Sequence, residues 1–128
     1  MAASTIYSLT VDCADPERLA GFWCDALGYR RFETELQAGE IQIRDPSGRG
    51  GDLLFVPVPE AKSVKNRLHL DLLPPSTMQA EVDRLRALGA TPGRVHEEAG
   101  WKWTVMQDPE ENEFCVCVRT DSDAVARP

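Results

Sequence analysis

The sequence lacks any apolar run long enough to cross a bilayer. Its first residues, Met-Ala-Ala-Ser-Thr, have neither the basic nor the apolar region of a secretion signal. It also lacks a CxxC pair, which excludes a zinc ribbon and a thioredoxin-type redox motif. We therefore predict a cytoplasmic protein with four reduced thiols, namely Cys13, Cys24, Cys115 and Cys117.

The sequence also has no excess of positively charged residues. The formal net charge is -7 and the pI is near 4.8, so nucleic acid and anionic membrane surfaces are excluded as partners by long-range repulsion. A small cationic or neutral molecule is the partner that this charge favours. The 128 residues, 42% of them hydrophobic, suffice for the core of one domain.

The first half of the chain has the pattern of a strand, a helix and three further strands. Residues 6–12 alternate between apolar and polar side chains, with Tyr7, Leu9 and Val11 on one side. Asp15 followed by proline is a helix start signal, and Gly28 is a helix stop signal. Strands are predicted at 29–35, 40–44 and 53–58, so the first unit covers about residues 6–59.

The same pattern begins again after a predicted linker at 60–66. Residues 67–73 alternate like a strand, and Ser76 with Gln79 forms a capping box for a helix that ends at Gly89. Strands are predicted at 95–96, 101–107 and 113–118, and a polar tail without structure at 120–128. The second unit therefore covers about residues 67–119.

The two halves of the sequence can be aligned with each other at a constant offset in residue number. The pair Leu27-Gly28 recurs at Leu88-Gly89, an offset of 88 − 27 = 61 residues, and this offset lays Ser8 on His69 and Leu54 on Cys115. An internal duplication of this length predicts an α+β fold made of two βαβββ modules in tandem.

Three motifs carry a resemblance to a known superfamily: Asp15-Pro16 with Leu27-Gly28-Tyr29, the segment His69-Leu70-Asp71-Leu72, and the segment from Asp108 to Phe114. Over residues 6–119 the chain resembles the vicinal oxygen chelate superfamily of glyoxalase I, extradiol dioxygenases, fosfomycin-resistance enzymes and bleomycin-binding proteins. The resemblance implies a single domain over 1–128, in which a curved mixed sheet surrounds a cavity and the helices cover its outer face. It also implies a homodimer.

In the enzymes of this superfamily a divalent metal is held by the first and last strands of each module. The resemblance carries the four ligand positions onto Ser8, Leu54, His69 and Cys115. A leucine cannot coordinate and a serine hydroxyl is a poor ligand, so no cofactor is expected. The alternative is a divalent metal (Zn, Fe, Mn or Ni) held by His69, Glu113 and Cys115, because Glu113 lies on the same strand face as Cys115.

Strand alternation predicts the cavity wall independently of the resemblance. The apolar side of both first strands is expected to pack on the helices, including Leu68 and Leu70 in the second module. The polar side is then expected to face the cavity, where unpartnered polar groups need water or a ligand. This side contains Ser8, Thr10, Asp12, Arg67, His69 and Asp71.

Two aromatic residues and a second histidine have competing interpretations. Trp101 and Trp103 alternate with polar residues and either pack in the core or form an aromatic wall for a planar ligand. His96, between polar neighbours, is expected to be solvated in a loop.

These observations leave three functional hypotheses. The first is a metal-independent protein of the bleomycin-resistance type, which binds a small molecule through Ser8, Thr10, Asp12, Arg67, Asp71, Trp101 and Trp103. The second is a lyase or isomerase in which His69 is the catalytic general base or, with Glu113 and Cys115, a metal ligand. The third, an interaction domain, predicts that side chains fill the concave face.

Overall fold

The structure is a computed structural model of the whole chain, and it describes residues 2–32 and 36–120. The chain divides into two compact units, Met1–Lys62 and Ser63–Pro128. The division falls inside the segment predicted as a linker. The predicted tail at 121–128 lies outside the described residues, as do residues 33–35 of the strand predicted at 29–35.

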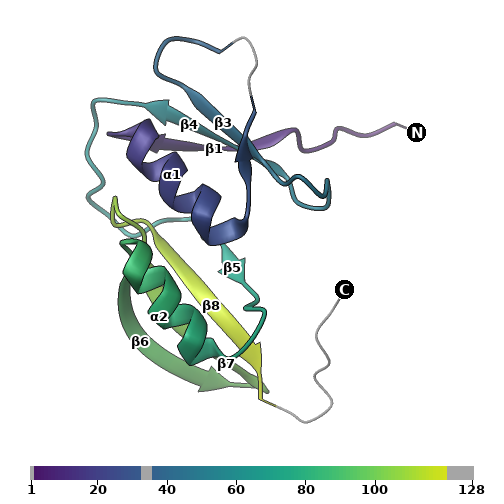
Figure 1. Ribbon diagram of the computed structural model, residues 1–128, viewed down its shortest axis with the longest axis vertical. Coiled ribbons are helices and arrows are strands. Elements are labelled where there is room, and N and C mark those ends of the chain that lie inside the picture. The colour runs from purple at the N-terminus through teal and green to yellow at the C-terminus, as the bar shows by residue number, and fades with distance from the viewer. Residues whose placement is uncertain (1, 33–35, 121–128) are drawn as a thin grey trace. The chain divides into compact units, whose positions relative to one another are not determined.

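The first unit contains one helix and a four-stranded mixed sheet (Figure 1). The sheet order is β1-β4-β3-β2, with β1 parallel to β4 and the other neighbours antiparallel. Its elements are β1 (Ser8–Cys13), α1 (Pro16–Leu27), β2 (Arg30–Arg31), β3 (Ile41–Arg44) and β4 (Asp52–Pro57).

The second unit repeats this arrangement with the sheet order β5-β8-β7-β6 and the single parallel pair β5 and β8. Its elements are β5 (Asp71–Leu72), α2 (Met78–Leu88), β6 (Thr91–Glu98), β7 (Trp101–Gln107) and β8 (Glu113–Arg119). The predicted α+β class and the two βαβββ modules are thereby confirmed. None of the described helices is long and apolar enough to span a membrane.

Local capping chemistry fixes the helix ends. The Asp15 carboxylate accepts a hydrogen bond from the Arg18 N–H at 3.2 Å, and α1 stops at Gly28, whose φ of 71° suits glycine. The start of α2 differs from the prediction, because Thr77 and not Ser76 is the N-cap. The Thr77 Oγ1 accepts from the Ala80 N–H at 3.1 Å.

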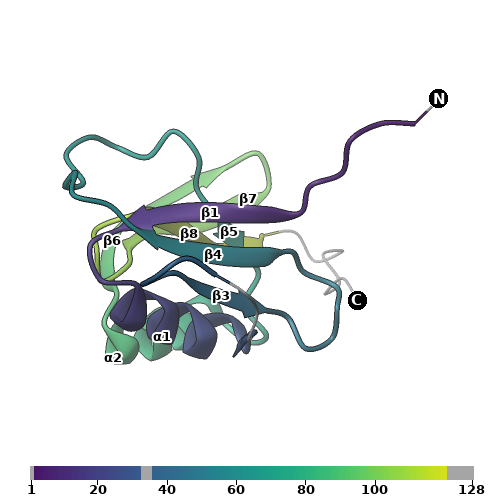
Figure 2. The same cartoon turned by 90° about the horizontal axis from the view of Figure 1, so that it is seen from above.

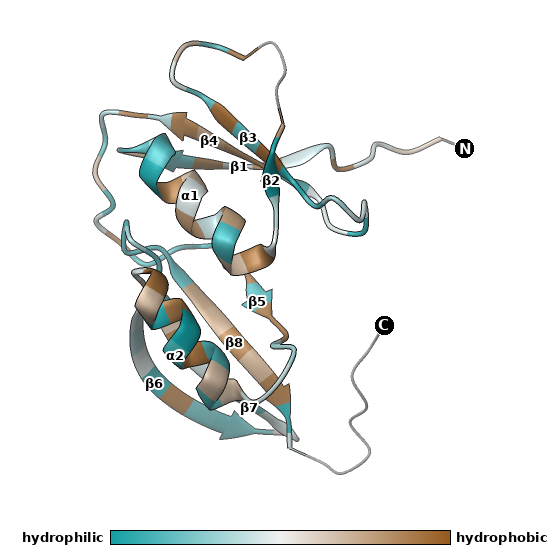
Figure 3. Ribbon diagram, viewed as in Figure 1, coloured by the Kyte–Doolittle hydropathy of each residue, from teal (hydrophilic) through white to brown (hydrophobic). Residues whose placement is uncertain are grey.

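Each helix covers one face of its own sheet. In the first unit α1 lies against β3 and β4, where Ile43, Leu53 and Phe55 are buried (Figure 2). In the second unit α2 packs on β6, β7 and β8, and Leu85 is buried with Phe114. The hydropathy colouring shows apolar turns on α1 interrupted by polar ones (Figure 3). The opposite face of each sheet is left for polar groups.

The strand predicted at 67–73 is shorter than its pattern suggests. Only Asp71 and Leu72 form β5, although the Leu70 carbonyl accepts a further backbone hydrogen bond from the Cys115 N–H at 2.9 Å. Leu68 is 77% exposed, so the prediction that it packs on the helix is wrong. The physical reason is that β5 is an edge strand with one neighbour, and that pairing begins beyond Leu68.

Candidate functional site

The sheet face of the second unit that points away from α2 carries an unusual set of side chains. In β8, Cys115 and Cys117 alternate with the buried core residues Phe114 and Val116, so both thiols lie on this face. The antiparallel register pairs Trp103 with Cys117. The face therefore combines thiols with aromatic rings.

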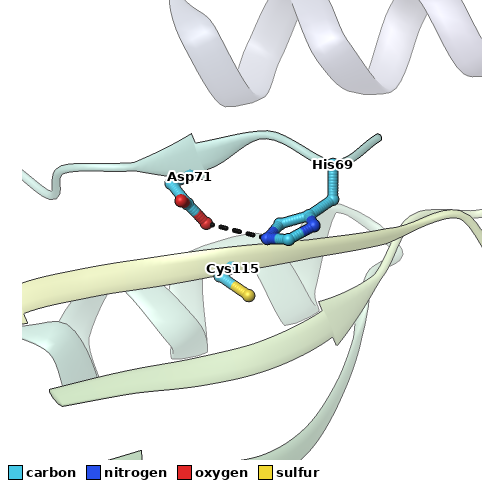
Figure 4. A group of neighbouring side chains, drawn as sticks. All are labelled: His69, Asp71 and Cys115. Carbon is cyan, nitrogen blue, oxygen red and sulfur yellow. Dashed lines mark ion pairs between the residues drawn. The ribbon is translucent and has the colours of Figure 1, made fainter. Parts of the chain in front are cut away.

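The parallel pair at the sheet edge adds a carboxylate and an imidazole. Asp71 of β5 lies opposite Cys115 of β8, and His69 precedes Asp71 by two residues. The His69 Nε2 is 3.3 Å from the Asp71 Oδ1. One donor atom from each of His69, Asp71 and Cys115 lies within 4.8 Å of the other two. Figure 4 shows the three side chains together, with the contact between His69 and Asp71 dashed.

These side chains line a cavity of about 750 Å³, which falls in the size range of small-molecule sites. Strands β5, β7 and β8 supply its walls, and the turn between β6 and β7 supplies one rim. Its lining consists of His69, Asp71, Leu73, Glu98, Ala99, Trp101, Trp103, Cys115 and Cys117. Side chains therefore do not fill the space on this face of the second unit, in contrast to what the hypothesis of an interaction domain predicts.

The two tryptophans belong to the cavity lining, and both are only half-buried. Trp103 stacks on His96, with ring centroids 5.4 Å apart and planes 17° from parallel. The Arg119 guanidinium lies 5.1 Å from the Trp101 ring centroid. The strand predicted at 95–96 is confirmed as part of β6, but the expectation that His96 is a solvated loop residue is wrong, because its ring stacks on an aromatic face.

The electrostatics of the site keep its thiols neutral. Burial raises the pKa of Cys115, and the nearby Asp71 carboxylate raises it further. Burial raises the pKa of Cys117 to about 12, with further contributions from Asp71 and Cys115. Neither thiol is therefore a thiolate nucleophile at neutral pH. The described lining contains the carboxylates of Asp71 and Glu98 but no lysine or arginine.

Not all predicted site residues come together here. The cavity lining includes His69, Asp71, Trp101, Trp103 and Cys115, but Arg67 is exposed and not part of it. The Glu113 Oε1 accepts a hydrogen bond from the Asn66 N–H at 2.8 Å, so Asp71 is the carboxylate beside His69 and Cys115.

The remaining predicted site residues belong to the first unit. Ser8, Thr10 and Asp12 lie on the face of β1 opposite to Leu9 and Val11. Ser8 is half-buried, whereas Thr10 and Asp12 are exposed.

Several lining residues were missed by the sequence analysis, namely Leu73, Glu98, Ala99 and Cys117. Cys117 had a usable signal, because it shares the strand face of Cys115. Ala99 had no such signal, because the predicted strands at 95–96 and 101–107 leave four residues between them, and Ala-Gly is not a dipeptide typical of a tight hairpin.

The first unit has a polar cluster of its own. The Asp52 carboxylate accepts from the Gln42 Nε2 at 2.7 Å and from the Arg44 Nε at 3.0 Å, and the Arg44 guanidinium lies 3.6 Å from the Phe32 ring centroid. The hydrogen bonds from Arg44 hold the pKa of Asp52 below its ordinary value. The Asp52 carboxylate thus has hydrogen-bond donors from both Gln42 and Arg44, which indicates a structural role for this cluster.

The residues present do not fit the metal site that the resemblance implies. Leu54 is in β4 on the same face as Ser8, and its hydrocarbon side chain cannot coordinate. The set of His69, Asp71 and Cys115 is different in chemistry, since it offers nitrogen, oxygen and sulfur donors suited to borderline-soft divalent metals.

Comparison with known proteins gives a family and a fold. The family model described as Glyoxalase-like domain matches residues 8–117. No curated protein matches the chain.

Solved structures resemble the chain at low sequence identity. A glyoxalase/bleomycin resistance protein/dioxygenase family enzyme from Burkholderia phytofirmans PsJN is 18% identical with a TM-score of 0.70, covering 87% of this chain and 95% of that one. A mutant of the fosfomycin resistance protein FosX from Listeria monocytogenes, in complex with Mn(II) and a dihydroxypropylphosphonic acid, is 11% identical with a TM-score of 0.72, covering 95% and 94%. The oxidase ChaP-H2 is 16% identical with a TM-score of 0.63, covering 92% and 95%.

Proposed function

Because the chain belongs to the glyoxalase-like domain family, we propose that it binds a small planar molecule, neutral or cationic, in the cavity of its second module. It does so without the usual metal of the superfamily, in the manner of a bleomycin-resistance protein. The single observation that carries this proposal is a lining with two tryptophans, two carboxylates and no cation among its described residues.

The cavity chemistry supports a planar ligand. A volume of about 750 Å³ accommodates a molecule of drug-like size. Indole rings stack on flat ligands and attract cations to their faces. Asp71 and Glu98 stabilise positive charge and oppose a carboxylate or phosphonate in the same space.

Ligand titration tests the proposal. We expect cationic aromatic compounds to change tryptophan fluorescence and raise the melting temperature, and anionic analogues of the same size to do neither. Trp103→Ala should weaken binding about tenfold, equivalent to about 1.4 kcal/mol, whereas Trp103→Phe should retain most of it because the aromatic face remains. Tyr7→Ala, at an exposed aromatic residue of the first module, is the control. Preferential binding of the anionic series contradicts the proposal.

The contact between His69 and Asp71 favours a second candidate function, a lyase or isomerase. With its Nε2 held 3.3 Å from the Asp71 carboxylate, the His69 ring is oriented for proton transfer in the cavity. His69 would act as general base next to a carbonyl of the substrate, and Asp71 would position it.

Proton exchange separates this candidate from simple binding. Small carbonyl compounds in D₂O, followed by NMR, should exchange the hydrogen next to the carbonyl faster with the protein than without it. His69→Gln should abolish the acceleration. His96→Gln provides a matched control, because His96 is the other histidine of the chain and is not part of the cavity lining. Equal loss in both variants contradicts the role of His69.

We also propose that the protein is a homodimer and that it is located in the cytoplasm. Light scattering after size-exclusion chromatography tests the homodimer, and a measured mass equal to that of one chain contradicts it. The cytoplasmic location is tested by fractionation of cells that express the protein.

A further inference from the structure

Two arginines lie opposite each other on the face of the first sheet that points away from α1. The antiparallel register pairs Arg30 of β2 with Arg44 of β3. Directly paired residues share one face of a sheet and have Cβ atoms about 4.5–5.5 Å apart. Arg31, the next residue of β2, points to the other face, where it forms an ion pair with Glu17 of α1. Two like charges opposite each other repel, and an anion bound between them removes the repulsion.

The Arg44 guanidinium is held in place and keeps part of its donors unused. Its Nε donates to the buried Asp52 carboxylate at 3.0 Å, and its Nη2 donates to the same carboxylate at 2.9 Å. Phe32 supports the guanidinium, with its ring centroid 3.6 Å away. The Nη1 group forms no hydrogen bond to the residues that the structure describes, and the Arg44 side chain is 41% exposed. The end of the fork is therefore fixed and accessible.

Arg30 adds a second guanidinium without a competing carboxylate. Its side chain is exposed and forms no ion pair with the described part of the chain. The Asp45 carboxylate follows Arg44 directly in sequence, but it accepts the backbone N–H groups of Ser47 and Gly50 within its own turn. The pair with Asp52 thus occupies one edge of Arg44, and the remaining donors of both arginines lie on one sheet face.

We propose that Arg30 and Arg44 bind a dianionic oxyanion of the phosphate type, either the free ion or the terminal phosphate of a small molecule. The planar fork of a guanidinium matches the spacing of phosphate oxygens and forms charge-assisted hydrogen bonds to them. Asp52 pre-positions one fork, so little side-chain freedom of Arg44 is lost on binding. The net charge of -7 opposes polyanions at long range, whereas a single phosphate is bound at short range by two cations.

This site is separate from the proposed function. It lies in the first module, and none of its residues lines the cavity of the second module. It also uses neither Ser8 nor Leu54, the two positions of this module at which the superfamily resemblance implies metal ligands. The anion site therefore goes beyond the proposed function and does not depend on it.

Isothermal titration calorimetry of the full chain tests the proposal, at constant ionic strength and at a mildly alkaline pH that keeps phosphate dianionic. Inorganic phosphate and phenyl phosphate are titrated separately, because a free ion and a terminal group present the same oxygens. We expect saturable binding at one anion per chain, and the tighter compound shows which source the site takes. Arg30→Gln should weaken binding about fivefold, and Arg44→Lys should do so similarly, because the charge remains but the fork is lost.

Arg31→Gln is the matched control, because Arg31 is the next residue of the same strand and lies on the opposite face. It should leave the affinity for phosphate within about twofold of wild type. The proposal is overturned if neither compound binds, if Arg30→Gln binds as tightly as wild type, or if Arg31→Gln loses as much affinity as Arg30→Gln. Circular dichroism shows whether each variant has folded, and Arg30→Ala supplies a second replacement if Arg30→Gln has not.

The two proposals can fail independently. Titration of the aromatic compounds in Arg30→Gln reports on the cavity of the second module alone, because anionic compounds have then lost a cation of the first-module site. Titration of phosphate in Trp103→Ala reports on the anion site alone, because Trp103 belongs to the other module.

Discussion

Replacing Ala99 with glycine is predicted to stabilise the second module. The register pairs Glu98 with Trp101, so Ala99 and Gly100 form a two-residue hairpin loop with φ values of 53° and 83°. Positive φ at both loop residues is the pattern of a type I′ turn, in which glycine is favoured. Ala99 therefore occupies a backbone conformation that opposes its Cβ, at the rim of the cavity.

The expected gain follows from two opposing contributions. A non-glycine residue in the left-handed region costs about 1–2 kcal/mol. Glycine loses more backbone entropy on folding, which costs about 0.5–1 kcal/mol. The free energy of unfolding should therefore rise by about 0.5–1 kcal/mol, and a urea slope of about 2 kcal/mol/M converts this into a midpoint shift of about 0.3–0.5 M.

Urea unfolding followed by circular dichroism measures this shift. Ala80→Gly is the matched control, since Ala80 is an exposed residue of helix α2 in the same module. There the same substitution should lower stability, by about 0.5–1 kcal/mol, because no positive φ is relieved. If Ala99→Gly destabilises the protein as much as Ala80→Gly does, the strained turn at the cavity rim is refuted.

Two further predictions concern the first module. Asp52→Asn should cost about 1.5–3 kcal/mol at neutral pH, because charge-assisted hydrogen bonds from Arg44 are lost. The pKa of Asp52 is lowered in the folded state, so its contribution exists above the unfolded pKa and disappears as the pH falls through the folded value. Urea midpoints of wild type and variant should therefore converge in acid, and a constant difference contradicts this. Gly50→Ala should destabilise by about 1 kcal/mol, because its Cβ would collide with the Tyr29 hydroxyl and the half-buried Tyr29 side chain would have to shift. Gly51→Ala, with open space around the Cβ, should change the melting temperature little, and equal losses in the two variants refute the collision.

Local chemistry made the helices and the module plan predictable. Asp15, Pro16 and Gly28 act through backbone geometry within a few residues, so the sequence contains the whole cause of the ends of α1. Ser76 and Thr77 are adjacent hydroxyl residues that both suit an N-cap, and sequence pattern alone does not separate them.

The site was less predictable because it depends on pairing between distant strands. Alternation placed Glu113 and Cys115 on one face, but the parallel register that sets Asp71 beside Cys115 is a long-range property. The backbone of Asn66 binds Glu113, and no periodicity indicates such a contact. The strand predicted at 95–96 is shorter than β6, because Pro92 and the register shift before Val95 resemble a loop, and the pairing of His96 with Trp103 is again a long-range property.

Because β5 is short, binding of a molecule in the cavity should be detectable by amide hydrogen exchange. An edge strand of two residues, held by one neighbour, is the part of a sheet that opens most readily in local fluctuations. Any molecule or ion that bridges β5 and β8 couples this strand to a buried one, so the free energy of local opening rises as the ligand concentration exceeds the dissociation constant. When the cavity is occupied, we therefore expect amide hydrogen exchange to slow at Leu72 and Cys115 and to change little in the first module.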